Sequence, residues 1–561
     1  MIRTESKIVS RLLSSTVAEI LLIPVGFGVL IALLYGNMLT AWWGWDDPSF
    51  LRLAYEYEPW EYFFIPDVWR KCQPANLNPW NILSFDLDLT LFGLNQSAFY
   101  AHHLFSLWLV VMGTYLFLRL WLNPLWSAMG AVLFICSAPV ATVAHQLMNR
   151  HYLEGLLFSV VVLYLYISAV RYERPLLSWV GALFYFFAVS AKEVFVPLAL
   201  LLPLIPERDL RRRLISALPF LLVLGFYALW RRYMLGRWVG GYSPSIDWTA
   251  VCHMIFKMPS FIFGDGAFAV VILLMIIALI FYAGWRNPSA RALILVAVLL
   301  LLGPILPVIH ISDPQRLLFL LVWALSIAVV LTLGTIAHSG IHRVVTALVI
   351  VAVIGFGMAG QGWKIRPGLE AAADGFAAHG RFIMEADEDQ ALLPSVRFGN
   401  WFATGLLWLR KNVLGEQPPR VVFDEIDLGK LNTDSLRFFR YDESRKCMQD
   451  VTGLLPHIYE TWKGKQRDRP LSVGIKYEGG ILSWELGPYE NGDYSIITYG
   501  ESGYKLRFPS SGARRFEMTE PILFRVRYDS PDGWITYSPL LYFDGKAVTE
   551  RGLKAIMSHD A

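Results

Sequence analysis

The sequence predicts a polytopic α-helical membrane protein that ends in an extracytoplasmic region of mixed α/β and then β-rich structure. Of its 561 residues, 55% are hydrophobic and 17% are charged, against about 25% charged in an average soluble domain. Long apolar runs recur up to residue 360, and near Trp363 the composition becomes mixed. We therefore expect a membrane domain over 1–362, a mixed segment over 363–469 and a β-rich module over 470–561.

The first apolar run, 20–40, is long enough for a membrane span, which needs about 20 residues. No small-residue cleavage site follows it, so we interpret it as a retained helix and not as a signal peptide. Ten similar runs follow, which makes about eleven predicted spans. They lie at 104–122, 126–145, 153–170, 176–191, 194–206, 215–230, 267–285, 292–309, 317–337 and 344–360.

Basic residues mark alternate connections, beginning with Arg3, Lys7 and Arg11 before the first span. Positive charge gathers on the cytoplasmic side of membrane proteins. We therefore expect a cytoplasmic amino terminus and an extracytoplasmic region beyond the last span. The short loops favour a bacterial inner (plasma) membrane.

The region after the spans begins with a helical pattern at 401–411 and a strand-like run at 420–423. Its second half alternates β-branched and aromatic residues in short runs separated by turn signals such as Asn-Gly and Asp-Gly, which is typical of antiparallel strands. The runs are 481–486, 494–499, 522–528 and 534–537. Strands at this spacing predict a sandwich that resembles an immunoglobulin or fibronectin type III module.

Composition and motifs argue against several classes of protein. The formal net charge is only +3 and there is no basic tract with interleaved aromatics, so we expect no nucleic-acid partner. The four cysteines have no metal-ligand spacing, and no second acidic cluster completes a divalent-metal site. No Walker-type loop is present. We therefore predict no cofactor and favour independence from metals over a divalent-metal site.

The first predicted outer loop, 42–96, is longer than a connection requires, and long loops tend to be functional. At its start Asp46 and Asp47 follow Trp42, Trp43 and Trp45, directly after the first span. Partial desolvation beside these rings raises the basicity of a carboxylate. The pair therefore fits a general base at the membrane surface, and the alternative is a simple helix cap. Most of the other acids of the loop, a group that includes Asp88, are expected to form a solvated face.

Further motifs follow in a fixed order. They are Phe99-Tyr100-Ala101-His102-His103, Asn149-Arg150-His151-Tyr152, Ala191-Lys192-Glu193-Val194 before Pro197, and Gln315-Arg316-Leu317. Together with the acid pair, they resemble the GT-C superfamily of membrane glycosyltransferases, closest to the protein O-mannosyltransferase-like branch and its bacterial relatives. The resemblance covers about residues 15–340. The chain departs from the family in Tyr152, where an acid is common, and in having no carboxyl-terminal tetratricopeptide repeats.

The resemblance implies transfer of a sugar from a polyprenyl-phosphate donor to a hydroxyl acceptor on a protein, glycan or lipid, with inversion. It implies Asp46 as the catalytic base, with Asp47 as second choice or orienting partner. A lipid phosphate leaves as an anion and needs positive charge, which Lys192, Arg316 and Arg150 would supply.

Roles for the other motif residues stay open. His102 and His103 would position a sugar hydroxyl or contact phosphate, or would be ordinary interfacial residues. Glu193 would bind the acceptor or orient Lys192. Equally, Lys192 could simply pair with Glu193 or extend to the membrane surface. Arg316 could pair with Asp313 or lie among the lipid head groups.

Three other functions share parts of this pattern. A transporter or flippase would more often show two related halves, which we do not detect. An O-antigen-type polymerase or ligase shares polyprenyl-linked substrates but places its arginines in a late outer loop. A non-catalytic glycan-binding membrane protein would use the carboxyl-terminal sandwich alone.

Overall fold

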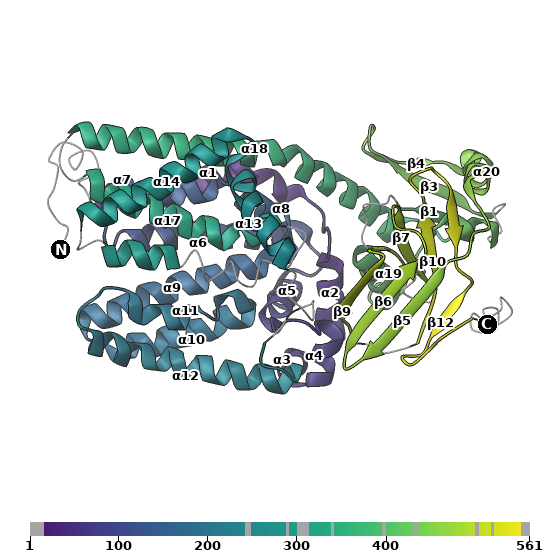
Figure 1. The fold of residues 1–561 in the computed structure, drawn as a ribbon, viewed down its shortest axis with the longest axis horizontal. Helices are drawn as coiled ribbons and strands as arrows, with labels where there is room; N and C mark the ends of the chain where they lie inside the picture. Colours follow the sequence, from purple (N-terminus) through teal and green to yellow (C-terminus); the bar gives the residue numbers. More distant parts are fainter. Residues whose placement is uncertain are drawn as a thin grey trace. The chain divides into compact units, whose positions relative to one another are not determined.

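The computed structural model describes residues 16–239, 241, 248–287, 291–299, 314–337, 341–394, 400–430, 435–499, 504–517 and 521–550. The chain forms two compact units (Figure 1). Unit 1 comprises Met1–Ala41, Leu77–Tyr233 and Ile246–Ala371, and unit 2 comprises Trp42–Asn76, Met234–Ser245 and Ala372–Ala561. This division differs from the predicted boundary at residue 362, because 42–76 groups with the carboxyl-terminal residues.

Unit 1 is helical. Its helices are α1 Thr16–Tyr35, η1 Gly36–Thr40, α5 Pro79–Phe92, α6 Gln96–Leu118, α7 Pro124–Ile135, α8 Ala138–His145, η2 Leu147–Asn149, α9 Arg150–Tyr172, α10 Pro175–Ala191, η3 Glu193–Phe195, α11 Leu198–Leu201, η4 Leu202–Leu204, α12 Leu210–Leu235, α13 Trp248–Phe263, α14 Ala267–Arg286, α16 Pro314–Leu317, α17 Phe319–Ile336 and α18 Ile341–Glu385. Helices α12 and α18 continue into unit 2.

Seven helices in the described part of the chain are long and apolar enough to cross a membrane, or eight if the bent pair α7 and α8 forms one span. The predicted polytopic helical class is confirmed, whereas the count of eleven is not. The runs at 176–191 and 194–206 form shorter apolar helices. The run at 292–309 lies outside the described residues beyond position 299.

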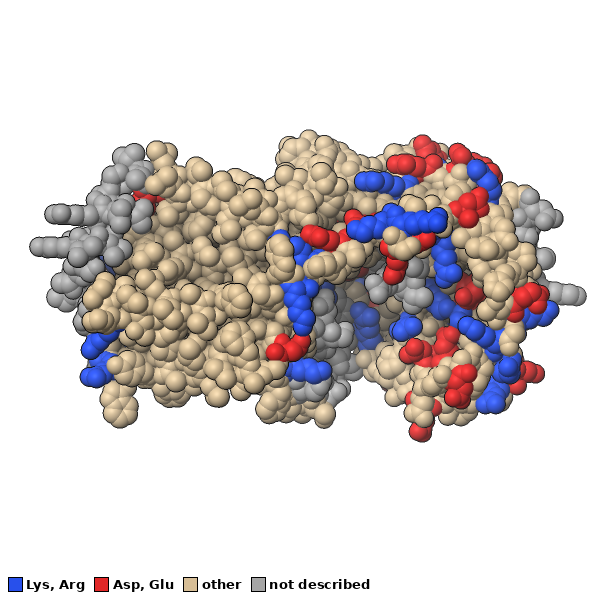
Figure 2. All heavy atoms as spheres, turned by 90° about the horizontal axis from the view of Figure 1, so that it is seen from above, with Lys and Arg blue, Asp and Glu red and all other residues tan. Residues whose placement is uncertain are grey.

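Burial identifies the centre of unit 1. The apolar window of α17 is 89% buried and that of α9 72%, whereas those of α1 and α12 are 17% and 28% buried. A helix that is hydrophobic all round and enclosed on all sides forms a core. The exposed apolar faces of α1 and α12 suit a lipid environment. In agreement, the visible surface of the helical unit carries few charged residues apart from its ends (Figure 2).

Two breaks between helices position the motifs of unit 1. Helices α7 and α8 meet at 61°, where Ser137 is extended and Pro139 occupies the first turn of α8. Helix α10 ends at Ala191 because Lys192 is extended, with φ −159°. A short 3-10 turn then leads to Pro197, whose ring cannot continue a helix from the preceding turn. The break places Lys192 at a helix end.

Unit 2 begins with the short helices α2 Asp47–Glu56, α3 Pro59–Phe64 and α4 Pro66–Cys72. A four-stranded sheet follows in the order β2-β1-β3-β4. Its strands are β1 Gln390–Leu393, β2 Arg420–Val421, β3 Arg437–Asp442 and β4 Cys447–Asp450, accompanied by α19 Asn400–Asn412, η6 Glu425–Lys430, η8 Thr452–Leu454 and α20 Leu455–Lys465. Helix α2 packs closely against α19, because Gly405 allows its backbone to approach that of Pro48.

The rest of unit 2 is the predicted sandwich. One sheet has the order β13-β12-β10-β7-β8, with β11 on β10, and the other has the order β5-β6-β9. The strands are β5 Ser472–Glu478, β6 Ile481–Gly487, β7 Asp493–Tyr499, β8 Tyr504–Phe508, β9 Ser511–Arg515, β10 Ile522–Asp529, β11 Ile535–Tyr537, β12 Leu541–Phe543 and β13 Val548–Glu550. Leu486 of one sheet and Phe524 of the other share a buried core, so the predicted β-rich region is confirmed.

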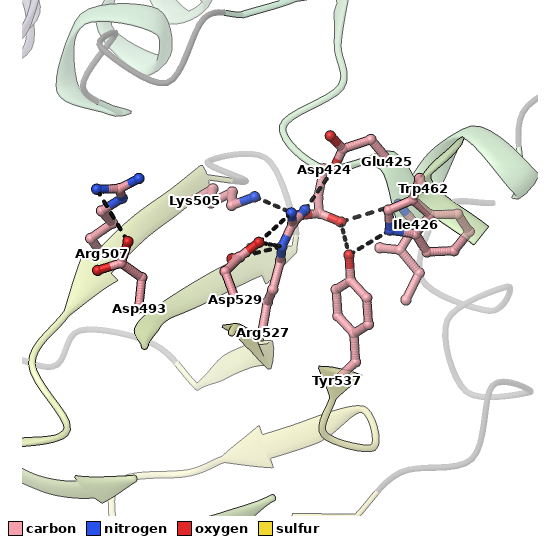
Figure 3. A network of polar contacts seen from close by, with 10 residues as sticks. All are labelled: Asp424, Glu425, Ile426, Trp462, Asp493, Lys505, Arg507, Arg527, Asp529 and Tyr537. Atoms are coloured by element: carbon pink, nitrogen blue, oxygen red, sulfur yellow. Dashed lines mark hydrogen bonds and ion pairs between the residues drawn. The ribbon is translucent and has the colours of Figure 1, made fainter. Parts of the chain in front are cut away.

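A buried polar network joins the sandwich to the mixed sheet within unit 2 (Figure 3). The Asp424 carboxylate accepts hydrogen bonds at 2.7 Å from Lys505, Arg527 and the Tyr537 hydroxyl. Arg527 also contacts Asp529 at 2.7 Å. Burial alone would raise the pKa of Asp424, but these cations lower it below its usual range. The ionised carboxylate therefore holds the two halves of unit 2 together.

Candidate active site

The eight residues predicted for the site are divided between the units. Asp46 and Asp47 belong to unit 2, and the others belong to unit 1. The six in unit 1 are Lys192, Glu193, Arg316, Arg150, His102 and His103.

The two acids of unit 2 have different environments. Asp46 precedes α2 as its N-cap and is partly exposed. Asp47 is fully buried, and its carboxylate accepts a hydrogen bond from the Gly44 backbone amide at 2.8 Å. This bond closes the turn that Trp45, at φ 47°, makes in the left-handed region. Asp47 thus shapes the turn, and Asp46 is the acid with access to solvent.

Lys192 is partly buried at the break between α10 and η3. Its ammonium nitrogen lies 5.3 Å from the centre of the Tyr152 ring, a cation–π distance. Within the described ranges, no carboxylate lies at ion-pair distance from it, so the alternative pairing of Lys192 with Glu193 does not occur. Tyr152 thus provides a neutral aromatic contact for this cation.

Lys192 lies in an electropositive cluster. It interacts electrostatically with Arg316, and the buried His151 interacts with both. The His151 ring lies beside the Met148 backbone carbonyl. His151 occupies the first turn of α9, whose amino-terminal end adds positive potential. Lys192 and Arg316 are two like charges held together in a low-dielectric setting, which favours a bound anion.

Glu193 has two partners in the protein, and neither of them is Lys192. Its carboxylate accepts a hydrogen bond from the Leu77 backbone amide at 2.7 Å and forms an ion pair with Arg231. The Leu77 carbonyl in turn accepts a hydrogen bond from Tyr227. Glu193 therefore ties η3 to α12 and to the start of the chain segment before α5. Its predicted role in binding an acceptor remains a prediction.

A second ionic cluster, which includes two acids that sequence reasoning did not assign to the site, lies between α5, α6 and α9. Arg150 is fully buried and lies 2.7 Å from Asp88, and Glu154 follows one turn later on α9. The His102 ring donates an N–H to the Asp88 carboxylate at 2.7 Å and lies 3.7 Å from Glu154. The expectation that Asp88 belongs to a solvated face is wrong, because its side chain is only 3% exposed.

The charged groups of this cluster also form hydrogen bonds with uncharged partners. Arg150 also donates to the backbone carbonyls of Ser84 and Phe99. The Trp80 indole and the Ser84 hydroxyl donate to Glu154 at 2.7 and 2.8 Å. These bonds connect α5, α6 and α9, so the cluster holds the three helices in position. We call it the positioning cluster. The signal in the sequence was Glu154 itself, a lone acid in an apolar run, since such residues are rarely unpaired.

The two histidines differ in access. The His102 side chain is 33% exposed, whereas His103 is fully buried and donates a ring N–H to the Val143 carbonyl at 2.9 Å. His102 can still reach a ligand, whereas His103 is engaged with backbone. No group of three or more His, Cys, Asp or Glu side chains in the described part of the chain is arranged to hold a metal ion. Independence from metals and cofactors stays a prediction.

No protein-family model matches the chain, and no curated protein matches it in sequence. Among solved structures it is similar to ArnT from Cupriavidus metallidurans in the apo state, with 14% identity and a TM-score of 0.45 over 79% of this chain and 95% of that one. It is also similar to the same protein bound to undecaprenyl phosphate, with 13% identity and a TM-score of 0.46 over 82% and 96%.

A third similar structure is the Archaeoglobus fulgidus oligosaccharyltransferase in complex with Zn and sulfate. The identity is 9% and the TM-score 0.45, over 94% of this chain and 98% of that one. We rest no functional assignment on these similarities, because all three TM-scores lie below 0.5.

Proposed function

We propose that this chain is a multi-pass membrane glycosyltransferase of the GT-C type that moves a sugar from a polyprenyl-phosphate donor to a hydroxyl acceptor, with inversion. The observation that carries the proposal is the pair of cations Lys192 and Arg316, with the buried His151 beside both. Charge is costly in a membrane unless it serves a ligand or a partner, and Lys192 has no carboxylate partner among the described residues. A phosphate monoester or diester is the anion that such a cluster suits.

The leaving group determines what the cations do. When the bond between the anomeric carbon and the phosphate oxygen breaks, the electron pair stays on the lipid phosphate. Lys192 and Arg316 then stabilise the added negative charge, so that no proton donor is required. The amino-terminal end of α9 acts in the same direction.

The acceptor hydroxyl is a poor nucleophile and must lose its proton as its oxygen bonds to the anomeric carbon. We assign this proton to Asp46. Asp46 is partly exposed, whereas the carboxylate of Asp47 already accepts the Gly44 amide. A single displacement with one base and a departing phosphate inverts the anomeric centre. Asp47 orients Asp46 by closing the turn before α2.

The remaining site residues fall into two groups. Glu193 holds η3, and with it Lys192, by its bonds to Leu77 and Arg231. Arg150 acts through the positioning cluster and not by contact with phosphate, since its guanidinium is fully buried among protein partners. His102 stays a candidate for contact with a sugar hydroxyl. The proposed location is the bacterial inner membrane, with the carboxyl-terminal region outside the cytoplasm.

The test is sugar transfer in membranes that contain matched amounts of each variant, with a panel of radiolabelled polyprenyl-phosphate sugars. We expect wild type and the control Asp209→Asn, an exposed acid in a loop, to consume one donor, and Asp46→Asn to consume none. Consumption of no donor by wild type would favour the transporter or the glycan-binding alternative. Full activity of Asp46→Asn would remove Asp46 as the base.

A further inference from the structure

Helix α8 packs against α16, the short helix that carries Arg316, and a side-chain hydrogen bond joins the two. Thr142 of α8 is only 2% exposed, and its hydroxyl donates to the side-chain carbonyl oxygen of Gln315 at 2.9 Å. A buried threonine in a helix commonly bonds the carbonyl four residues earlier, which here is that of Ala138 at 3.2 Å. The bond to Gln315 is the shorter one. Thr142 therefore links two segments that are 173 residues apart in the chain.

Helix α16 depends on its neighbours for its position. It spans only Pro314–Leu317, and a single helical turn relies on tertiary contacts for its stability. Arg316 also interacts electrostatically with Lys192, and two like charges repel each other strongly where the dielectric constant is low. Without a restraint, we expect Arg316 to move away from Lys192.

The bond from Thr142 restrains the residue that directly precedes Arg316. Consecutive Cα atoms are about 3.8 Å apart, so fixing Gln315 also fixes the backbone from which the Arg316 side chain extends. Helix α8 is itself held in place, because the His103 ring donates to the Val143 carbonyl, next to Thr142, at 2.9 Å. All residues of α8 are buried. Helix α6 thus holds α8, and α8 holds α16.

The same helix leads to the histidine of the site. Helix α8 ends at His145, and the turn η2 connects it to α9, where His151 lies six residues further along. Within this connection, the Asn149 side chain donates to that of Gln146. Helix α8 thus bonds to the segment of Arg316 and continues directly into the segment of His151, so it relates the positions of both.

We propose that Thr142 is a positioning residue of the phosphate site: its bond to Gln315 keeps Arg316 close enough to Lys192 for both cations to contact one phosphate. Thr142 acts through Gln315 and needs no contact with the substrate. The inference rests on the proposed function and adds a neutral residue to the site. It requires the hydroxyl, so serine should replace threonine at this position and valine should not.

The experiment compares variants of the full chain in lipid nanodiscs by their Kd for a C55 polyprenyl phosphate. Thr142→Val keeps the shape of the side chain but removes the hydroxyl, and its Kd should rise about three- to tenfold, the range for one lost neutral hydrogen bond. Thr142→Ser keeps the hydroxyl and should bind like wild type. The matched control is Thr332→Val, which should also bind like wild type. Thr332 is 1% exposed on α17, and its hydroxyl has no hydrogen-bond partner among the described residues.

A double-mutant cycle with Arg316→Ala separates positioning from a general effect on the fold. If Thr142 acts through Arg316, Thr142→Val should raise the Kd in the wild-type background and leave it unchanged in the Arg316→Ala background. An equal rise in both backgrounds would show that Thr142 supports the fold in general and would overturn the inference. A wild-type Kd in Thr142→Val, or the same rise in Thr142→Ser, would overturn it as well.

A variant of the other partner completes the test. Gln315→Leu removes the same bond and should give the same rise in Kd, so the result does not depend on the stability of Thr142→Val. If wild type binds polyprenyl phosphate and Arg316→Ala binds it more weakly, but Thr142→Val and Gln315→Leu bind normally, the positioning role fails alone. If wild type does not bind polyprenyl phosphate, the proposed function fails with it.

Discussion

Replacing Arg150 by Met should destabilise unit 1, because it removes the cation from a buried cluster with two carboxylates. The side chains of Asp88 and Glu154 are only 3% and 5% exposed. Glu154 keeps its bonds from Trp80 and Ser84, so the uncompensated charge falls mainly on Asp88, whose remaining partner is His102. Breaking a buried ion pair from one side costs about 3–5 kcal/mol, and we expect a loss of stability in that range.

The assay is the temperature at which half of the purified protein remains monodisperse in detergent after heating. Arg150→Met should lower it by several degrees, and Arg150→Lys should fall in between, because Lys keeps the charge but cannot reproduce the guanidinium fork. The double variant Arg150→Met with Asp88→Asn should recover part of the loss, since it neutralises the orphaned acid. Wild-type stability of Arg150→Met, combined with a raised KM for the donor, would refute the positioning role and restore the sequence-based prediction of phosphate contact.

Three further outcomes are expected. Gly405→Ala should destabilise unit 2 by about 1–3 kcal/mol through a clash with the backbone of α2, whereas Gly453→Ala, which meets no neighbour, should be neutral in the same thermal scan. Because the folded-state pKa of Asp424 is lowered, the stability that this carboxylate adds to unit 2 should be complete above about pH 4 and lost as the pH falls further. The measurement is reversible unfolding of unit 2 as a function of pH, and a stability that does not fall with acid pH would contradict the prediction. Asp47→Asn should lower both thermal stability and sugar transfer, because the Asp47 carboxylate holds the turn. Asp46→Asn should abolish sugar transfer but keep the stability of wild type. The reverse pattern would exchange the roles of the two acids.

Much of the architecture could be predicted from periodicity. The helical pattern at 401–411 became α19 Asn400–Asn412, and the run at 522–528 became β10 Ile522–Asp529. Local patterns specify such elements because side-chain period and turn residues act over a few positions. The number of membrane spans was harder to predict, because an apolar run of moderate length fits a short buried helix as well as a span.

The site was predictable only in part, for a physical reason. Lys192 and Arg316 stood out because charge at a helix end in an apolar region needs an explanation. Asp88 did not, because its burial depends on Arg150 and on the packing of α5 against α9, which are tertiary contacts. The true partner of Glu193 was hidden in the same way, since Arg231 lies far along the chain. The end of the last helix was also missed, as α18 continues to Glu385 with no change of helical period.

The central claim is that the cluster of Lys192, Arg316 and His151 binds the phosphate of a polyprenyl-linked sugar donor. Its most direct test is the kinetics of transfer by Lys192→Ala, with Lys364→Ala, an exposed lysine of the same unit, as the matched control. A charged contact with phosphate contributes about 1.5–3 kcal/mol, so kcat/KM for the donor should fall by about ten- to a hundredfold while Lys364→Ala keeps wild-type values. An unchanged kcat/KM in a stable Lys192→Ala protein would contradict the account.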